Sequence, residues 1–336
     1  MNSELDIYKQ NRIRELQTIY INNASRLYSD LDKNVKNIQS KMLISKSMKQ
    51  QNINNLTKQY NANINILKNA LAQAIANVNK FTPKQIEIKN NKKALLIGIN
   101  YTGTPYELTG CINDTNNIKD KLSKEGFADN NIKILTDLTS KKATCKNILE
   151  ELKNLLINSQ AGDLLFLLYS GHGLYTMDRN RDEKNGQDEM IIGCDLQGII
   201  DDDLKSLIQT HLKANVTLFA MFDSCFSGSV LDLKYQYLDS LNYETYTENP
   251  KDLETVGNVF MISGCTDDQT SAEAMINNKV TCAMTWSLLE GLKQQPGCSW
   301  RELIKTMRDL LKKSQYTQIP QFSSGQFVNI NSAVFI

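Results

Sequence analysis

Two short segments of this 336-residue chain hold residue types that can form a nucleophile and its base. Only two histidines occur, and His172 lies in the motif YSGHG (169–173), directly after an apolar run. A second apolar run leads into DSCFSG (223–228), which contains Cys225. A thiolate can attack a carbonyl carbon while a nearby imidazole transfers the proton. The sequence therefore predicts His172 and Cys225 as a catalytic dyad, with the backbone N–H groups of Gly173 and Cys225 as oxyanion donors.

Other interpretations of these residues fit the sequence less well. His211 lies in an amphipathic helical pattern, so we interpret it as a surface or packing residue. A cysteine that follows an apolar strand is usually a buried, inert thiol. The Asp, Ser and Gly residues around Cys225 argue against such a core position. A phosphatase loop would need an arginine at position 231, and Leu231 excludes that class.

Alternating strands and helices must position the two motifs. Short apolar runs predict strands at 94–99, 132–135, 164–169, 216–222 and 259–263. Amphipathic patterns between and after them predict helices at 114–125, 145–158, 202–214, 281–294 and 300–313. This alternation predicts an α/β fold with a mainly parallel sheet flanked by helices. Sites in such sheets gather at the carboxyl ends of neighbouring strands, where both motifs fall.

Residues 1–80 form a region of a different kind. They contain neither proline nor glycine, and apolar residues recur at helical spacing. We expect an N-terminal arm of two long amphipathic helices, arranged as a hairpin or a coiled coil. Such an arm would act as a stalk or in self-association rather than in catalysis. Residues 81–91 are the expected linker, and 92–336 the expected catalytic domain.

Composition and charge exclude several classes of function. Residues 1–80 carry twelve basic and five acidic side chains, whereas the whole chain has a net charge of +1. The arm lacks a dense basic block, so we expect no nucleic-acid partner. No apolar run approaches the roughly 20 residues that span a bilayer, so we expect no membrane partner. Seven cysteines without a CxxC pair, and no signal peptide, indicate free thiols in a reducing, cytoplasmic compartment.

The two motifs resemble the His and Cys motifs of metacaspases, the caspase-like cysteine peptidases of plants, fungi and protists. Three further segments are similar to segments of type I metacaspases: GCIND (110–114), ISGCTDDQTSA (262–272) and QIPQFSSG (318–325). The resemblance covers about residues 92–332. It implies a caspase-like α/β fold and cysteine endopeptidase activity through the dyad.

The resemblance also implies a substrate pocket. The S1 positions of the family fall on Cys111, Asp114, Ser170 and Asp223. Two carboxylates that are buried together need a cation to compensate them and would repel an acidic side chain. The expected partners are therefore protein or peptide substrates with Arg or Lys at P1.

Metacaspases of this type depend on calcium, so the resemblance implies Ca²⁺ as an activating cofactor. The ligands fall on Asp188, Asp201, Asp202 and Asp232, which all offer the hard oxygen donors that calcium prefers. Without the resemblance, the acidic run 201–203 is typical of the first turn of a helix. The acidic loop 178–189 likewise lacks EF-hand spacing. We expect calcium to reorder the loop near the site rather than to activate the nucleophile.

The chain departs from the family pattern in two places. Many relatives have His directly after the catalytic cysteine, where this chain has Phe226, so that position is not required for proton transfer. The usual prodomain is replaced by the helical arm. Self-processing at a basic residue is a further expectation, with Lys234, Lys251 and the lysines of 89–93 as candidates. The alternative function is a catalytically silent caspase-fold scaffold assembled through the arm, against which the intact dyad and pocket acids count.

Overall fold

The computed structural model describes residues 4–83, 86–177, 187–225, 230–237, 246–249, 252–264, 273–276 and 279–336. The chain divides into two compact units, residues 1–84 and 85–336. Among the described residues, no helix combines the length and the apolar character needed to cross a bilayer.

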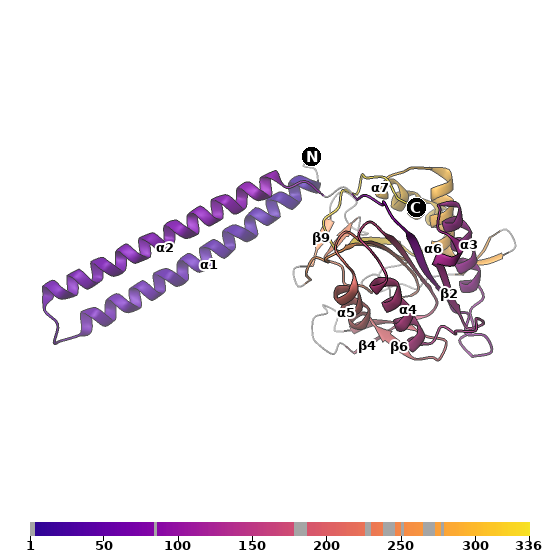
Figure 1. The fold of residues 1–336 in the computed structure, drawn as a ribbon, viewed down its shortest axis with the longest axis horizontal. Helices are drawn as coiled ribbons and strands as arrows, with labels where there is room; N and C mark the ends of the chain where they lie inside the picture. The colour runs from indigo at the N-terminus through magenta and orange to yellow at the C-terminus, as the bar shows by residue number, and fades with distance from the viewer. Residues whose placement is uncertain are drawn as a thin grey trace. The chain divides into compact units, whose positions relative to one another are not determined.

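The first unit is a pair of long helices, α1 (Glu4–Ser40) and α2 (Lys46–Lys80). They lie side by side along their length (Figure 1). The start of α1 lies beside the end of α2. There Lys9 Nζ donates to the Asn79 carbonyl (2.9 Å), and the rings of Tyr8 and Phe81 lie 4.9 Å apart. The pair is therefore an antiparallel hairpin. The predicted helical N-terminal region is confirmed.

The second unit is built on an eight-stranded sheet with the order β2-β1-β3-β7-β10-β13-β8-β9. Its parallel strands are β1 (Lys92–Gly98), β2 (Ile132–Thr136), β3 (Leu164–Ser170), β7 (Thr217–Asp223) and β10 (Asn258–Ser263). Antiparallel pairing adds β13 (Gln321–Ser324), β8 (Tyr235–Tyr237) and β9 (Tyr246–Glu248). The predicted mainly parallel sheet is confirmed, and β3 and β7, which lead into the two motifs, are neighbours.

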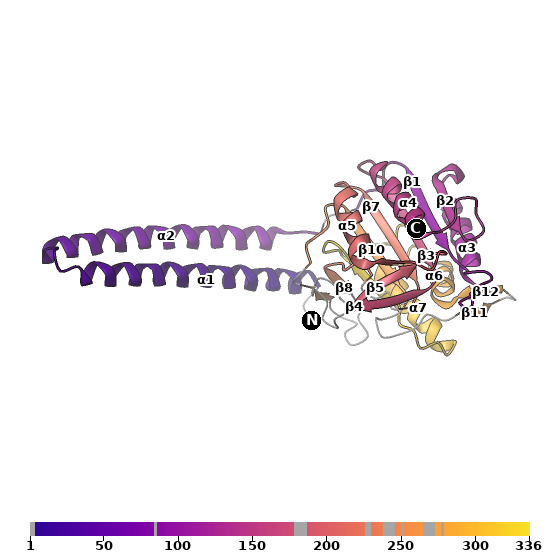
Figure 2. The same ribbon diagram turned by 90° about the horizontal axis from the view of Figure 1, so that it is seen from below.

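Helices cover both faces of this sheet (Figures 1 and 2). One face carries α4 (Cys145–Ile157) and α5 (Asp201–His211), and the other carries α3 (Cys111–Lys124), α6 (Ala283–Gln294) and α7 (Trp300–Lys313). A short 3₁₀ helix, Asp129–Asn131, precedes β2. Each predicted helix has a counterpart in this set.

Side chains of a strand point alternately to the two faces, and this alternation decides which residues of β3 and β7 meet which helices. Tyr169 and Phe222 join the apolar core that also contains Leu152 of α4. Ser170 and Asp223, one position further along, contact residues of α3 and α6 instead. The last residue of each strand is therefore turned away from the α4/α5 core.

Short strands complete the fold near the sheet's carboxyl end. β4 (Gly173–Met177), β5 (Gln187–Ile192) and β6 (Gly198–Ile200) form a three-stranded sheet. β11 (Glu273–Ile276) and β12 (Lys279–Cys282) form a hairpin directly before α6. These strands are short and mix polar and apolar residues without a clear period, so they do not stand out in the sequence.

Candidate active site

The two residues predicted as the dyad follow the ends of two neighbouring strands. β3 and β7 pair in parallel with Ser170 opposite Asp223, and His172 and Cys225 each lie two residues further on. A side chain at Gly173 would overlap the Cys225 carbonyl oxygen, so the two main chains are in direct contact there. Only glycine fits this approach. His172 and Cys225 are both partly exposed. The register of one strand pair thus brings the two motifs together.

A backbone carbonyl sets the tautomer of His172. Its Nε2 lies 2.8 Å from the carbonyl oxygen of Tyr106. A carbonyl can only accept a hydrogen bond, so Nε2 must carry the proton that makes this bond. In the neutral imidazole the other nitrogen, Nδ1, is then unprotonated and can act as a base. The Tyr101 ring packs 4.6 Å from the imidazole and restricts its motion.

Two buried tyrosines hold the main chain of His172. The Tyr101 hydroxyl accepts the His172 N–H (2.9 Å), and the Tyr169 hydroxyl donates to the His172 carbonyl (2.7 Å). The two hydroxyl oxygens lie 3.1 Å apart. Burial raises the pKa of both phenols, so they remain neutral at any physiological pH. Tyr101 was not predicted as a site residue; it reaches the site from the turn after β1, where its φ of 52° is unusual for a residue other than glycine.

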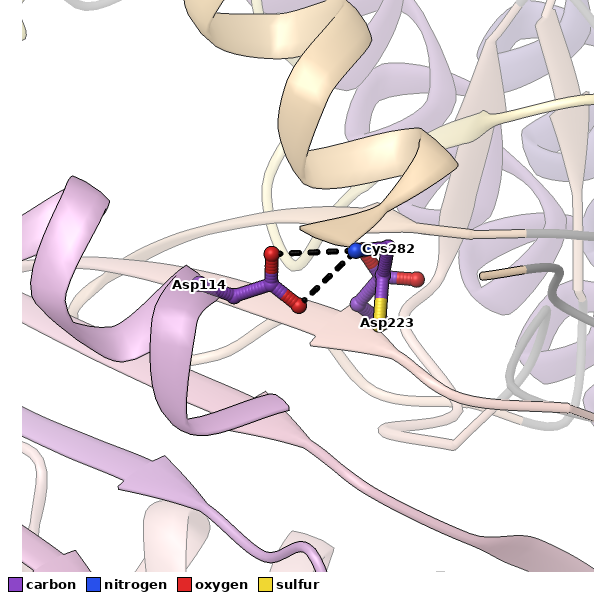
Figure 3. Close-up of side chains that lie close together, drawn as sticks. All are labelled: Asp114, Asp223 and Cys282. Carbon is purple, nitrogen blue, oxygen red and sulfur yellow. Dashed lines mark hydrogen bonds between the residues drawn. The ribbon is translucent and has the colours of Figure 1, made fainter. Parts of the chain in front are cut away.

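The first turn of α6 and the residue before it bind the two acids predicted for the S1 pocket. Asp114, in the first turn of α3, accepts from the Cys282 N–H at 3.0 and 3.2 Å (Figure 3) and from the Thr281 hydroxyl. Asp223 accepts from the N–H and the hydroxyl of Thr285, at 2.9 and 2.8 Å. Free N–H groups and the helix dipole make a helix N-terminus favourable for negative charge. These carboxylates therefore satisfy donors of α6, whose N-cap residue makes no side-chain cap bond of its own.

The two acids lie close together in a buried environment. Oxygen atoms of Asp114 and Asp223 and the sulfur of Cys282 all lie within 4.8 Å of one another, and all three residues are at most 6% exposed. Ser170 donates to Asp114 at 3.0 Å. Burial, and secondly the charge of Asp223, raise the pKa of Asp114 to about 7. The cluster therefore concentrates negative charge that its hydrogen bonds compensate only in part.

Cys111 also belongs to this pocket. It is 1% exposed at the start of α3, and its thiol is the neighbour that most strongly raises the pKa of Cys282. The four residues predicted for S1 thus lie in one buried cluster. Thr281, Cys282 and Thr285 were not predicted; the only sequence signal for them is that they begin the helix expected at 281–294.

A second acidic cluster lies where β5 meets α5. The β5–β6 pairing sets Met190 opposite Ile200, which brings Asp188 to the start of α5. One oxygen of each of Asp188, Asp201 and Asp202 lies within 4.8 Å of the others. Burial, and then the charge of Asp188, raise the pKa of Asp201 to about 6, although two N–H groups donate to it at 2.7 Å. These hard oxygen donors are of the kind that calcium prefers, so the three residues fit a calcium ion.

The fourth predicted calcium ligand lies outside that cluster. Asp232 forms an ion pair with Lys205 (3.3 Å), whose Nζ also lies 2.7 Å from Asp252. Lys205 projects from α5 one turn after Asp201. A lysine therefore competes with any cation for the Asp232 carboxylate.

Some predicted features fall outside the described residues. These are residues 178–186 of the acidic loop 178–189, the position after Cys225 (Phe226), the candidate processing residue Lys251 and the metacaspase-like segment from 265 to 272.

Comparisons with known proteins agree with this geometry. A family model described as "Metacaspase, peptidase C14 domain" matches residues 92–234. The chain is 35% identical to Metacaspase-1A of Neurospora crassa, over 71% of this chain and 64% of that protein. It is 34% identical to Metacaspase-1 of Meyerozyma guilliermondii, over 71% of each. It thus spans just under two thirds of the Neurospora protein. A crystal structure of a Geobacter sulfurreducens protein superposes with a TM-score of 0.54 at 23% identity, covering 72% of this chain and 97% of that one, which is a likeness of fold.

Proposed function

We propose, from the premise that this chain belongs to the metacaspase family of cysteine peptidases, that it is a calcium-activated endopeptidase that cleaves after Arg or Lys. The observation that carries the proposal is the buried pair Asp114 and Asp223, in which Asp223 ends β7, two residues before Cys225, and Asp114 reaches it from the first turn of α3. The dyad supplies peptide-bond hydrolysis, and the acid pair supplies the preference for a cationic side chain.

The reaction would begin with proton transfer from Cys225. Nδ1 of His172 accepts the thiol proton, and the thiolate attacks the scissile carbonyl carbon. The N–H groups of Gly173 and Cys225 would donate to the oxyanion that forms. The imidazolium then gives its proton to the leaving amine, and water hydrolyses the thioester. Throughout, the Tyr106 carbonyl keeps Nε2 protonated and the ring in one orientation.

The P1 preference follows from electrostatics. A guanidinium or ammonium group that enters the pocket would meet two carboxylates, and its charge would favour the ionised form of Asp114. A carboxylate at P1 would add a third negative charge in a buried space. Truncating one partner of such a buried pair typically costs about 2–5 kcal/mol. Selectivity for basic over acidic P1 residues should therefore reach several orders of magnitude.

Calcium would bind Asp188, Asp201 and Asp202 and neutralise their charge. Calcium bound there could affect catalysis through β5. Asp188 belongs to this strand, and Ile191 of the same strand pairs with Gly173 of β4. Gly173 follows the catalytic histidine directly and touches the Cys225 main chain. A cation on Asp188 would stabilise β5 and, through this pairing, the main chain that carries the oxyanion donor. Calcium itself takes no part in the chemical steps.

The proposal also includes self-processing at a lysine and self-association through the N-terminal arm. The Lys89 side chain is 69% exposed in the segment before β1, whereas that of Lys234 is 11% exposed and faces Glu248. Lys89 is therefore the better candidate for cleavage in the folded chain.

In the arm, Ile19, Ile21 and Ile66 are each more than half exposed, which favours burial against a second arm.

A P1-scanning assay tests the proposal. Peptides that differ only in having Arg, Lys or Asp at P1 are incubated with the wild-type chain, with and without calcium. We expect turnover of the Arg and Lys peptides in calcium and none of the Asp peptide. Cys225→Ala should abolish turnover. The control Cys298→Ala removes a buried thiol just before α7 and should leave turnover unchanged.

Either of two results would contradict the proposal. One is undiminished turnover by Cys225→Ala, and the other is equal cleavage of the Asp and Arg peptides. A thiol-reactive substrate analogue that fails to label Cys225 in calcium would instead favour the catalytically silent scaffold.

A further inference from the structure

The acidic pocket contains a sulfur donor that peptide hydrolysis does not use. Cys282 comes from β12 and the N-cap of α6, and its thiol lies beside the two carboxylates (Figure 3). One oxygen each of Asp114 and Asp223 and the sulfur of Cys282 lie within 4.8 Å of one another. A second buried thiol, that of Cys111, adjoins Cys282. Two acids and two thiols thus converge on one small volume.

We propose that this pocket binds a zinc ion through Asp114, Asp223 and Cys282. Zinc binds thiolate sulfur at about 2.3 Å and carboxylate oxygen at about 2.0–2.2 Å, so in its usual tetrahedral arrangement two ligand atoms lie about 3.4–3.6 Å apart. The three donor atoms all lie within 4.8 Å of one another, so side-chain shifts of about 1 Å or less would bring them to that spacing. Three protein ligands leave a fourth position for water.

The donor set selects zinc over calcium. Calcium takes six to eight oxygen ligands and has little affinity for sulfur, whereas zinc accepts a mixed set of sulfur and oxygen. The cluster of Asp188, Asp201 and Asp202 has only oxygen donors. The two clusters found among the described residues are therefore matched to different cations, and calcium should not displace zinc from Asp114, Asp223 and Cys282.

The hydrogen bonds in the pocket are compatible with a bound ion. Asp114 accepts the Cys282 N–H and the hydroxyls of Thr281 and Ser170, and a metal would take the place of one of these hydroxyl donors, which can rotate to donate elsewhere. The Cys282 and Thr285 N–H groups would thus continue to orient the two acids, as outer partners of metal ligands do. On binding, the Cys282 thiol releases its proton to solvent and becomes a thiolate ligand.

Zinc and a substrate would compete for the same space. This consequence rests on the proposed function, in which Asp114 and Asp223 receive the P1 cation. A zinc ion on these carboxylates would block Arg or Lys from entering and would do so reversibly. The zinc site itself requires no catalysis and can be measured in an inactive chain.

Calorimetric titration of the full chain with zinc tests the site directly. The parent is Cys225→Ala, which removes the catalytic thiol as a competing ligand. Adding Cys282→Ala should weaken the tightest zinc binding by at least about 100-fold, because losing a direct ligand should exceed the 10–100-fold loss typical of outer partners. Adding Cys298→Ala, an equally buried thiol elsewhere, should leave it unchanged. Unchanged affinity in the Cys282→Ala protein would overturn the proposal.

Cobalt(II) provides a second readout that also guards against misfolding. We expect a sulfur-to-cobalt charge-transfer absorption in the parent and in Cys298→Ala but not in Cys282→Ser, which retains the size and polarity of the side chain. If that absorption persists in Cys282→Ser, the assignment of Cys282 is wrong.

A competition assay separates the zinc site from the proposed function. In the active chain, zinc should raise the KM for an Arg-P1 peptide more than it lowers kcat. Cleavage after Arg without zinc binding would refute the zinc site alone. Zinc binding in a chain with no preference for basic residues would refute the P1 assignment alone.

Discussion

The ionised carboxylate of Asp114, which is the form that can bind a cation, should lower the free energy of unfolding. The variant Asp114→Asn tests this prediction. The folded-state pKa of about 7 lies above the ordinary value of 3.8. Below pH 3.8 the carboxyl group is protonated in both states. As the pH rises towards 7, the unfolded chain releases this proton while the folded chain retains it, so the free energy of unfolding falls.

The size of the effect follows from the same shift. One pKa unit corresponds to about 1.4 kcal/mol, so the loss approaches about 1.4 kcal/mol per pH unit inside this window. The upper limit is about 4 kcal/mol above pH 7, reduced in practice because Asp223 shares the charge. Asn carries no charge in either state, and the Ser170 hydroxyl can rotate to accept from its amide. The variant should therefore be more stable than the parent above pH 7, by about 1–3 kcal/mol.

Urea unfolding across this pH range measures the difference in the free energy of unfolding between Asp114→Asn and the parent. A chelator is present so that neither acidic cluster carries a cation. The advantage of Asp114→Asn should shrink as the pH falls towards 4. Asp203→Asn, which changes an exposed acid of α5, should show no such trend. In the active chain, Asp114→Asn should lower kcat/KM for Arg-P1 peptides by about 100-fold or more. A variant that is no more stable than the parent at pH 8 would refute the reasoning.

Three other changes test the rest of the site. Tyr101→Phe removes the hydroxyl that accepts the His172 N–H, so it should lower the free energy of unfolding by about 1–3 kcal/mol and should lower kcat more than it changes KM. Tyr106→Phe is the control, because it keeps the backbone carbonyl that orients the His172 ring, and its kcat and KM should be nearly unchanged. Asp201→Asn should raise the calcium concentration for half-maximal activity at least about tenfold, whereas Asp203→Asn should not; equal effects would contradict the cluster. Lys89→Ala should abolish self-cleavage before β1 on a denaturing gel while peptide turnover persists, and an unchanged fragment pattern would exclude this bond.

Local patterns sufficed to predict the main elements. The apolar runs predicted the five parallel strands to within two residues, and the amphipathic patterns predicted five helices with similar accuracy. Strands such as β4 and β6 were missed because a few mixed residues carry no clear period. The arm was predictable because a long stretch without Gly or Pro favours a helix regardless of its surroundings.

The candidate site was predictable only in part. His172 and Cys225 could be selected because each follows a buried run, and their residue types limit the chemistry. The hydroxyl of Tyr101 and the carbonyl of Tyr106 could not be predicted, since they reach His172 from a distant turn. The ion pair between Asp232 and Lys205 was equally invisible, because it joins segments far apart in the chain.

What the sequence by itself determined is therefore the kind of chemistry: a thiol, an imidazole and several carboxylates, each at the end or start of a regular element. The tertiary structure decided which of these groups act together. Pairing of Ser170 with Asp223 sets the two motifs side by side, and the start of α6 binds Asp114 and Asp223 through its N–H groups. The same packing adds Cys282 to the acids. Such contacts depend on strand order and helix packing, which bring together residues that no local spacing relates.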